Sequence, residues 1–208
     1  MCSWSCPFHL RWPAGRTPDS RADTGGRGQF WALFMIILYL LGQSDKPLLF
    51  ADCAVVSQSS LSQWASIAIS SNQSYRELLD NESYVAIHSF STKESAHHRL
   101  REGVKEATEL AQEISPQLRP DGELLDATLM PQVAQRKAPQ STVARRANVL
   151  GFPDLNSENI SYKLIQRLGG FQAIGPIIQG FTKPANGLSR GCSVDNMVNL
   201  VAVNLSMG

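Results

Sequence analysis

The segment from Gly175 to Asn196 combines the residue types best suited to binding an anion. It reads GPIIQGFTKPANGLSRGCSVDN, a glycine- and proline-rich stretch that ends where Ser193 would cap a helix, with Asn196 three residues further on. The start of a helix offers free N–H groups and a partial positive charge, and Arg190 adds a planar set of donors beside the Ser189 hydroxyl. These residues predict a phosphate or oxyanion site; the simpler alternative is a capped helix with a solvated arginine.

The other reactive side chains form no catalytic or metal-binding pattern. There is no Walker A loop, dinucleotide-binding GxGxxG or GxSxG motif. His88, His97 and His98 have no ligand partner nearby, which favours loop or helix-start histidines, and Cys53 after a short strand is typical of a buried thiol. The four scattered cysteines include no CxxC pair, so they indicate reduced thiols in a cytoplasmic protein and no metal site.

Composition indicates a folded globular protein, because 43% of its 208 residues are hydrophobic and 18% are charged. The formal net charge is only +1, so the chain has no strong positive electrostatic field that would attract nucleic acid or an anionic membrane surface. Residues 1–29 lack apolar periodicity and are expected to be irregular. The run FWALFMIILYLL that follows favours a buried strand; it is short for a membrane helix, which needs about 20 residues, and its leader is long for a signal peptide. An altered reading frame is a third alternative.

From Pro47 onward, short apolar runs alternate with segments of helical periodicity. Strands are expected at 48–51, 84–87, 147–152 and 174–178, and helices at 60–79, 96–114, 125–138, 156–168 and from 193. The clearest helix has six apolar residues on one side: Ala96, Leu100, Val104, Ala107, Ala111 and Ile114. We expect Pro131 to disturb the 125–138 helix, and Asn156 or Ser157 to cap the one after it. This alternation predicts an α/β fold: a three-layer α/β/α domain with a mainly parallel sheet, which binds ligands at the carboxyl ends of its strands.

Four blocks of sequence resemble the phosphate acetyltransferases, in the same order and at similar spacing. They are LLFADCAVV (48–56), VAIHSFSTKESA (85–96), RKAPQSTVARRANVLGFPDLNSENISYK (136–163) and the segment 175–196 described above. The resemblance implies that acetyl-CoA and phosphate are exchanged for acetyl phosphate and CoA in a ternary complex. It implies no metal and no bound cofactor, because coenzyme A enters as a substrate, and it implies a homodimer.

The resemblance also assigns roles to individual residues. Ser189 and Arg190 occupy the positions of the family's orienting serine and charge-stabilising arginine, and Asn196 occupies that of its carboxylate base. The residues implied to bind substrate are Cys53, Asn159, Lys183 and Asn186. Because an amide accepts no proton at neutral pH, a general-base contribution of about 10²- to 10⁴-fold is expected to be lost, and the chain to be impaired.

Further departures from the family pattern lie outside these positions. Gly187 replaces an aspartate, Arg145 and Glu158 replace glycines, and one residue is missing from the run 121–127. If those glycine positions need positive φ or room for CoA, the substitutions are expected to cost stability or binding.

The family has two α/β domains with the active site between them. Residues 47–175 correspond to the second domain and 176–208 to a strip that returns to the first, while 1–29 are irregular and 30–46 form a strand-like linker. The fold is therefore expected to be incomplete, with an apolar face of the last helix uncovered at Met197, Leu200 and Val201. Alternatives to an acyltransferase are a non-catalytic domain that binds CoA or a partner, a degenerate fragment, and a protein tethered to a membrane by residues 30–41.

Overall fold

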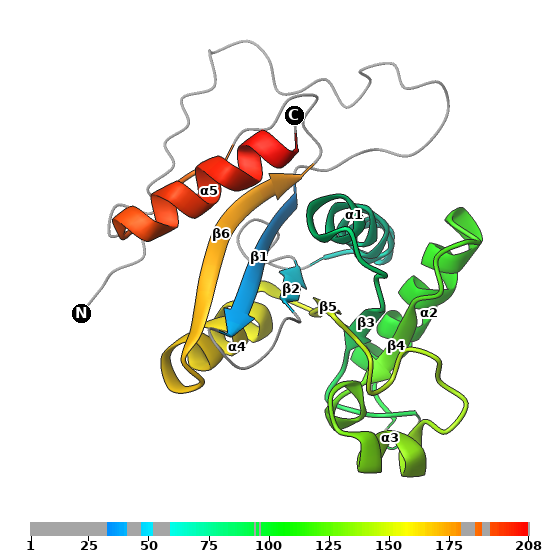
Figure 1. Ribbon diagram of the computed structural model, residues 1–208. Coiled ribbons are helices and arrows are strands. Elements are labelled where there is room, and N and C mark those ends of the chain that lie inside the picture. The colour runs from blue at the N-terminus through cyan, green and yellow to red at the C-terminus, as the bar shows by residue number, and fades with distance from the viewer. Residues whose placement is uncertain are drawn as a thin grey trace. The chain divides into compact units, whose positions relative to one another are not determined.

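The computed structural model describes residues 47–51, 59–93, 95, 97–179, 186–188 and 192–207, and the backbone of residues 33–40. Its elements are, in order, β1 (Leu33–Leu40), β2 (Leu48–Ala51), α1 (Leu61–Leu79), β3 (Val85–His88), α2 (Arg99–Ile114), β4 (Asp121–Leu124), a 3₁₀ turn (Asp126–Thr128), α3 (Pro131–Lys137), β5 (Val149–Gly151), α4 (Leu155–Leu168), β6 (Phe171–Gln179) and α5 (Val194–Ser206) (Figure 1).

The strands of the described residues form one sheet in the order β4-β3-β5-β2-β1-β6. β2 pairs with β5, β5 with β3, and β3 with β4, all in parallel, whereas β1 runs antiparallel to both of its neighbours. Since β2 and β6 both run opposite to β1, every strand except β1 points in the same direction. The mainly parallel sheet is therefore confirmed, and so is a strand within residues 30–41.

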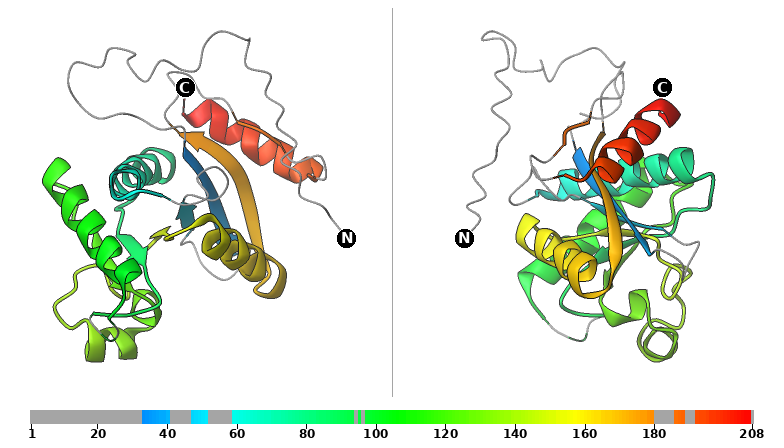
Figure 2. Two further views of the ribbon diagram at one scale, coloured as in Figure 1. Left: turned by 180° about the vertical axis from the view of Figure 1, so that it is seen from behind. Right: turned by 60° about the vertical axis from the view of Figure 1, so that its left-hand side comes forward.

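Helices cover both faces of the sheet and complete the three-layer architecture. Successive strand residues point to opposite faces: Leu49 packs with the α1, α2 and α5 side, and Phe50 with the α3 and α4 side. The views from two further directions show α4 and α5 on opposite sides of the sheet (Figure 2). This arrangement follows from parallel β-α-β units, whose strands need a cover on both faces.

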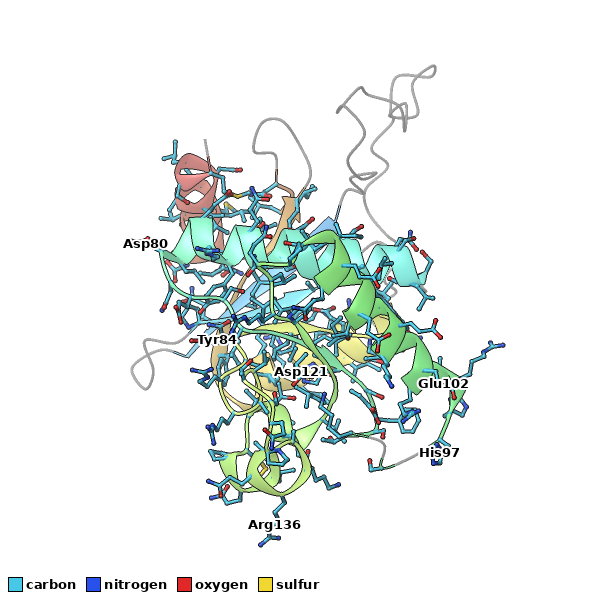
Figure 3. The ribbon with its side chains drawn as sticks, turned by 90° about the vertical axis from the view of Figure 1, so that its right-hand side faces the viewer. Asp80, Tyr84, His97, Glu102, Asp121 and Arg136 are labelled. Carbon is cyan, nitrogen blue, oxygen red and sulfur yellow. The ribbon has the colours of Figure 1, made fainter. Side chains whose placement is uncertain are left out.

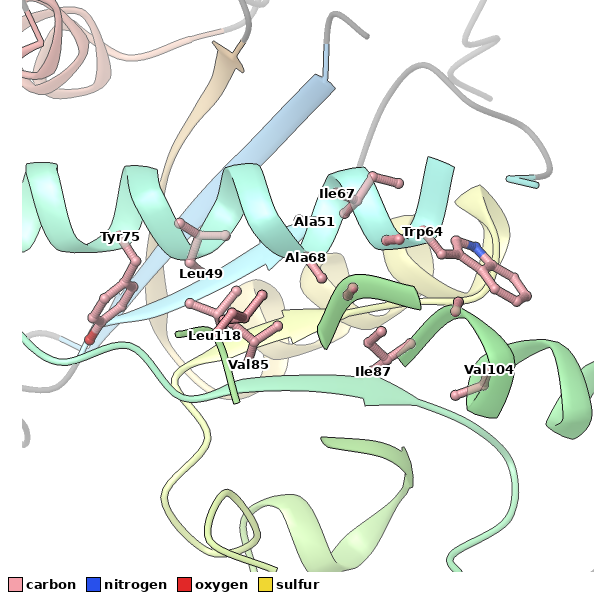
Figure 4. Packing of buried hydrophobic residues seen from close by; sticks show 14 of the residues in the cluster. Leu49, Ala51, Trp64, Ile67, Ala68, Tyr75, Val85, Ile87, Val104 and Leu118 are labelled. Carbon is pink, nitrogen blue, oxygen red and sulfur yellow. The ribbon is translucent and has the colours of Figure 1, made fainter. Parts of the chain in front are cut away.

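The core on the α1 side is dense and aliphatic. α1 begins with a capping box, in which Ser60 and Gln63 satisfy each other's backbone N–H groups. It carries two buried aromatic side chains: Trp64 lies toward α2, near Val104, and Tyr75 lies at the other end of the helix, near Leu49 (Figure 4). Among the described helices, none is long and apolar enough to cross a membrane.

The expected apolar side of α2 is only partly buried. Val104, Ala107 and Ala111 are buried as predicted. Leu100 and Ile114, however, are 47% and 59% exposed, at the two ends of the helix. Helical periodicity identifies a stripe along a helix, but it does not show how much of that stripe a neighbour covers.

The segment 121–138 differs most from the sequence-based expectation. Asp121–Leu124 form β4, which was not predicted because the run DGEL has neither β-branched residues nor apolar alternation. Pro131 does not disturb a longer helix but opens the short helix α3, where its missing N–H is not needed. The expected helix over 125–138 is therefore wrong: the structure has a 3₁₀ turn followed by α3.

Two further boundaries need correction. α4 is capped by Asp154 rather than by Asn156 or Ser157: one Asp154 oxygen accepts from the Ser157 N–H at 2.9 Å, the other from the Ser157 hydroxyl at 2.8 Å. A carboxylate here also complements the positive end of the helix dipole. The strand expected at 174–178 is longer, because its pairing with β1 extends from Phe171 to Gln179.

Candidate functional site

The loops that follow the parallel strands meet at one edge of the sheet, where α/β proteins usually bind ligands. In the described residues these loops include 89–93 after β3, 125–128 after β4 and 152–154 after β5. The segment after β6, which carries the serine and arginine predicted to do chemistry, leaves from the same edge.

Polar residues of the loop after β3 hold that loop to β4. The Ser91 hydroxyl donates to the Glu123 carboxylate at 2.8 Å, and the Leu125 N–H donates to the Thr92 hydroxyl at 3.1 Å. The Arg101 guanidinium lies 3.7 Å from the same carboxylate, and both side chains are almost completely buried. Glu123 has φ 57°, a left-handed conformation. Ser91 and Thr92 thus join this loop to β4 and to the residue that follows β4.

His88 ends β3 as a neutral, structural histidine. Its Nδ1 lies 3.3 Å from the Gly151 carbonyl oxygen, its Nε2 lies 3.2 Å from the Thr128 hydroxyl, and its ring stacks on Phe152 at 4.9 Å. Burial lowers the pKa of His88 to about 4, against a smaller opposing effect of the Gly151 carbonyl. The ring is therefore uncharged at neutral pH and poorly suited to act as an acid or base there.

The neighbouring polar groups also have structural roles. His98 caps α2, its Nδ1 accepting from the Leu100 N–H at 3.2 Å, as expected for a helix-start histidine. His97 is exposed beside it (Figure 3). Asp121 pairs with Lys93 and accepts from the Ser141 hydroxyl, so it ties the loop after β3 to the loop before β5.

The described residues contain no metal-binding cluster, and the cavity that lies beside α1 is small. No group of three or more His, Cys, Asp or Glu side chains in these ranges is arranged to hold a metal ion. A cavity of about 10 Å³ lies between α1 and the ends of β2, β3 and β5, lined mainly by apolar residues such as Ala51, Trp64 and Phe152. It has room for about one water molecule, far less than a substrate needs.

Of the residues predicted for the site, Asn159, Asn186 and Asn196 are described. Cys53, Lys183, Ser189 and Arg190 lie outside the described residues. Asn159 lies in α4, on the face of the sheet opposite α5, and is half-buried. Asn196 lies in α5, and Asn186 lies in the segment between β6 and α5, so the three described asparagines come from different parts of the chain.

Asn196 lies in the first turn of α5 and its side chain is half-buried. Its backbone N–H donates to the Ser193 hydroxyl at 3.2 Å, which confirms the predicted helix cap. The only acidic residue in this turn is Asp195, which is exposed.

Asn186 lies near the opposite end of α5. Its Oδ1 accepts from the Ile178 N–H at 2.7 Å, and its Nδ2 donates to Asn204 Oδ1 at 2.9 Å. Asn196 and Asn204 are eight residues apart on one helix, about 12 Å along its axis. The described structure thus joins Asn186 to Asn204, not to Asn196. Sequence reasoning missed Asn204, since nothing in its local pattern marks it.

Arg145 and Glu158, the two positions where the resemblance implies glycine, differ in their backbone. Arg145 has φ 66°, in the left-handed region that favours glycine, and its N–H donates to the Ala127 carbonyl at 2.9 Å. Glu158 lies within α4, where positive φ is not required, and its side chain is fully buried. The backbone argument therefore applies to Arg145, whereas at Glu158 the change adds a carboxylate to a buried site.

Comparison with known proteins identifies the family. Residues 26–205 match the phosphate acetyl/butaryl transferase family. The chain is 53% identical over 155 residues to the phosphate acetyltransferase of Thermoanaerobacterium thermosaccharolyticum, covering 74% of this chain and 47% of that protein. It is 50% identical over 159 residues to that of Clostridium acetobutylicum, covering 76% and 48%.

A solved structure, the phosphotransacetylase of Streptococcus pyogenes, superposes with a TM-score of 0.81 at 39% identity, over 86% of this chain and 54% of that one. Together, the α/β fold and the extent of the family match show that this chain belongs to the phosphate acetyl/butaryl transferase family. The chain spans about half the length of the curated relatives it matches.

Proposed function

We propose that this chain is an acyltransferase of the phosphate acetyltransferase type, which exchanges acetyl-CoA and phosphate for acetyl phosphate and CoA, and that Asn196 impairs it. The observation that supports this most strongly is the 53% identity to a phosphate acetyltransferase over 155 residues. CoA and phosphate are substrates in this proposal, which includes no metal, bound cofactor or nucleic acid. By resemblance we also propose that the protein is cytoplasmic and forms a homodimer. Within each chain, we propose residues 47–175 and 176–208 as two structural parts.

The proposed reaction needs a base, a hydrogen-bond donor that stabilises the negative charge developing on the acetyl oxygen, and a group that orients the reacting species. In the direction of thioester synthesis, the CoA thiol gives its proton to a base and the thiolate attacks the acetyl carbon of acetyl phosphate. The new C–S bond gives a tetrahedral species with a negative oxygen; as its carbonyl re-forms, the C–O bond breaks and phosphate leaves with that electron pair. Arg190 would stabilise the negative oxygen of the tetrahedral species and Ser189 would orient it. Cys53, Asn159 and Lys183 are the proposed substrate contacts.

Asn196 occupies the base position with a side chain that accepts no proton at neutral pH. Aspartate has nearly the same shape, and a carboxylate in the first turn of a helix is favoured by the helix dipole. The bond from the Asn196 N–H to Ser193 uses only the backbone, so Asn196→Asp keeps it. The substitution therefore changes the proposed chemistry and disturbs the local structure little.

The test is thioester formation from acetyl phosphate and CoA by the purified chain and by Asn196→Asp. We expect little turnover by the native chain and a gain of about 10²-fold or more in the variant, the size of a general-base contribution. Asn199→Asp, which adds the same charge one turn further along α5, serves as the control and should gain nothing. Equal rates for the two aspartate variants would contradict the role of position 196.

A second candidate function, a non-catalytic domain that binds a partner, is supported by the outer side of α5. Val194, Val198, Val201 and Leu205 are 72%, 61%, 56% and 78% exposed. Their spacing of four, three and four residues gives one continuous apolar stripe along the helix. Such a stripe suits the apolar face of another folded domain, and two-domain relatives suggest an α/β domain.

Binding of a separately produced domain tests this second candidate. The probe is the half of the Thermoanaerobacterium relative that this chain does not match. We expect it to co-purify with the native chain, and not with a Val198→Lys, Val201→Lys variant. Equal recovery with both chains, or with neither, would rule out the α5 stripe as the binding surface.

A further inference from the structure

The segment between β6 and α5 is held at its start by α1. Gln179, the last residue of β6, is 4% exposed although its side chain is polar. Its Oε1 accepts from the Ser74 hydroxyl at 3.1 Å, and its Nε2 donates to the Ser71 hydroxyl at 3.5 Å. A buried amide with partners on a neighbouring helix has little freedom to move, because leaving its partners would cost the desolvation of both groups.

Asn186 brings the chain back to the same end of β6. The bond from the Ile178 N–H to Asn186 Oδ1, 2.7 Å long, connects Asn186 to the residue just before Gln179. Gln179 and Asn186 are therefore two fixed points of the chain at the same end of β6. The chain continues from Asn186 through Leu188, which is 39% exposed, to Ser189 and Arg190.

Asn204 extends this link to α5. The Asn186 Nδ2 donates to Asn204 Oδ1 at 2.9 Å, and both side chains are half-buried. Asn204 is one turn beyond Leu200, the only residue of α5 that is buried in the described structure. One asparagine side chain thus joins the end of β6 to the anchored part of α5.

We infer that Asn186, together with Asn204, is a positioning residue for the proposed acyl-transfer site. The inference rests on the proposed function. Each polar atom of the Asn186 side chain has a protein partner, the Ile178 N–H for Oδ1 and Asn204 Oδ1 for Nδ2, and the two bonds together fix the orientation of the amide. Asn186 precedes Ser189 and Arg190 by three and four residues, so it sets where the segment that carries them begins.

Kinetics in the Asn196→Asp background separate positioning from substrate contact. We expect Asn186→Ala to lower kcat by about 10- to 100-fold with a smaller change in KM, since misplacement of about 1 Å can cost that much. Asn204→Ala should lower kcat in the same way, and the double variant should be no slower than Asn186→Ala alone, because both remove one link. Asn199→Ala on the same helix is the control and should leave kcat unchanged. A rise in KM for Asn186→Ala, with Asn204→Ala neutral, would assign Asn186 to substrate binding.

Amide hydrogen exchange tests the link independently of activity. In the 208-residue chain with Asn196 unchanged, Asn186→Ala and Asn204→Ala should each accelerate exchange in peptides covering 186–193 by about 10-fold, and Asn199→Ala should not. If Asn196→Asp is inactive but exchange accelerates as expected, the proposed function fails while the link stands, and Asn186 loses its catalytic relevance. If exchange is unchanged in both variants, the positioning inference itself is overturned.

Discussion

α1 and α5 cover the same face of the sheet but differ in how their apolar residues are used. α1 buries seven of its 19 residues against the strands and α2. α5, with 13 residues, buries only Leu200, so the expectation that Leu200 would be uncovered is wrong, while its outer stripe of valines and a leucine is exposed. A helix that is apolar on several sides is normally surrounded by protein. The contrast indicates that α1 is matched to neighbours within this chain, whereas α5 carries more apolar surface than the described residues cover.

Because of this difference, we expect the residues that determine stability and those that carry the proposed chemistry to lie in different parts of the molecule. The α1 side of the sheet contains the dense core, so substitutions there should lower the free energy of unfolding. α5 and the segment before it carry Asn196, Asn186 and the predicted serine and arginine, but little of the core. Changes there should affect activity or binding more than folding.

The largest expected effect comes from truncating the core under α1. Leu49 is fully buried, and Leu49→Ala should lower the free energy of unfolding by about 2–5 kcal/mol in a denaturant titration. The matched change on α5, Val201→Ala, removes an exposed side chain and should stay within about 0.5 kcal/mol. Similar losses for the two variants would remove the distinction between the helices.

His88 makes the stability of the sheet edge depend on pH. Its pKa is about 4 in the folded protein and near 6.5 when unfolded, so the unfolded state binds a proton more readily. The contribution of His88 should be complete above pH 6.5 and decline as pH falls toward 4, by up to about 3 kcal/mol. Denaturant titrations of the native chain and His88→Leu across this range measure it. The difference in the free energy of unfolding between the two chains should change over that interval, and a constant difference would contradict a neutral, half-buried histidine.

Two strand glycines give a sharper test of packing on the α1 and α2 side. A Cβ at Gly122 would lie 2.0 Å from the Thr108 hydroxyl oxygen, whereas one at Gly151 would find its nearest neighbour at 3.7 Å. Gly122→Ala should therefore destabilise by about 1–3 kcal/mol through overpacking, and Gly151→Ala should be nearly neutral. Thermal unfolding of both variants checks the order, and the reverse order would show that the strand positions are wrongly assigned.

The smallest effect is expected at Arg145. Its left-handed backbone costs a non-glycine residue about 1 kcal/mol, so Arg145→Gly should be neutral or stabilising by up to that amount. Arg136→Gly, which places glycine inside α3, should destabilise by a similar amount. If both variants lose stability equally in denaturant titrations, the backbone at 145 does not favour glycine.

Much of the fold could be predicted because its elements have clear local signals. The strands at Leu48 and Val85 are short apolar runs, and α1 and α2 have strong helical periodicity. β4 could not be predicted, since pairing with β3 makes DGEL a strand, and this pairing is not encoded in its own composition. The cap of α4 was misplaced by two or three residues because Asp154, Asn156 and Ser157 can all cap a helix.

The candidate site was less predictable than the fold. The Ser193 cap followed directly from the sequence, since a serine before an apolar periodic run has a local signature. The bond between Asn186 and Asn204 did not, because it joins residues 18 positions apart through the placement of α5. The contact of Gln179 with Ser74 spans 105 positions and likewise depends on the sheet order. The proposed roles of Ser189 and Arg190 rest on resemblance alone.

The central claim is that an amide now occupies the position of the catalytic base in a scaffold related to the phosphate acetyltransferases. Thioester formation from acetyl phosphate and CoA, measured side by side for the native chain and Asn196→Asp, tests it most directly. The account predicts a nearly silent native chain and a gain of about 10²-fold or more in the variant. A native chain that already turns over as fast as Asn196→Asp would contradict it and require a base elsewhere in the molecule.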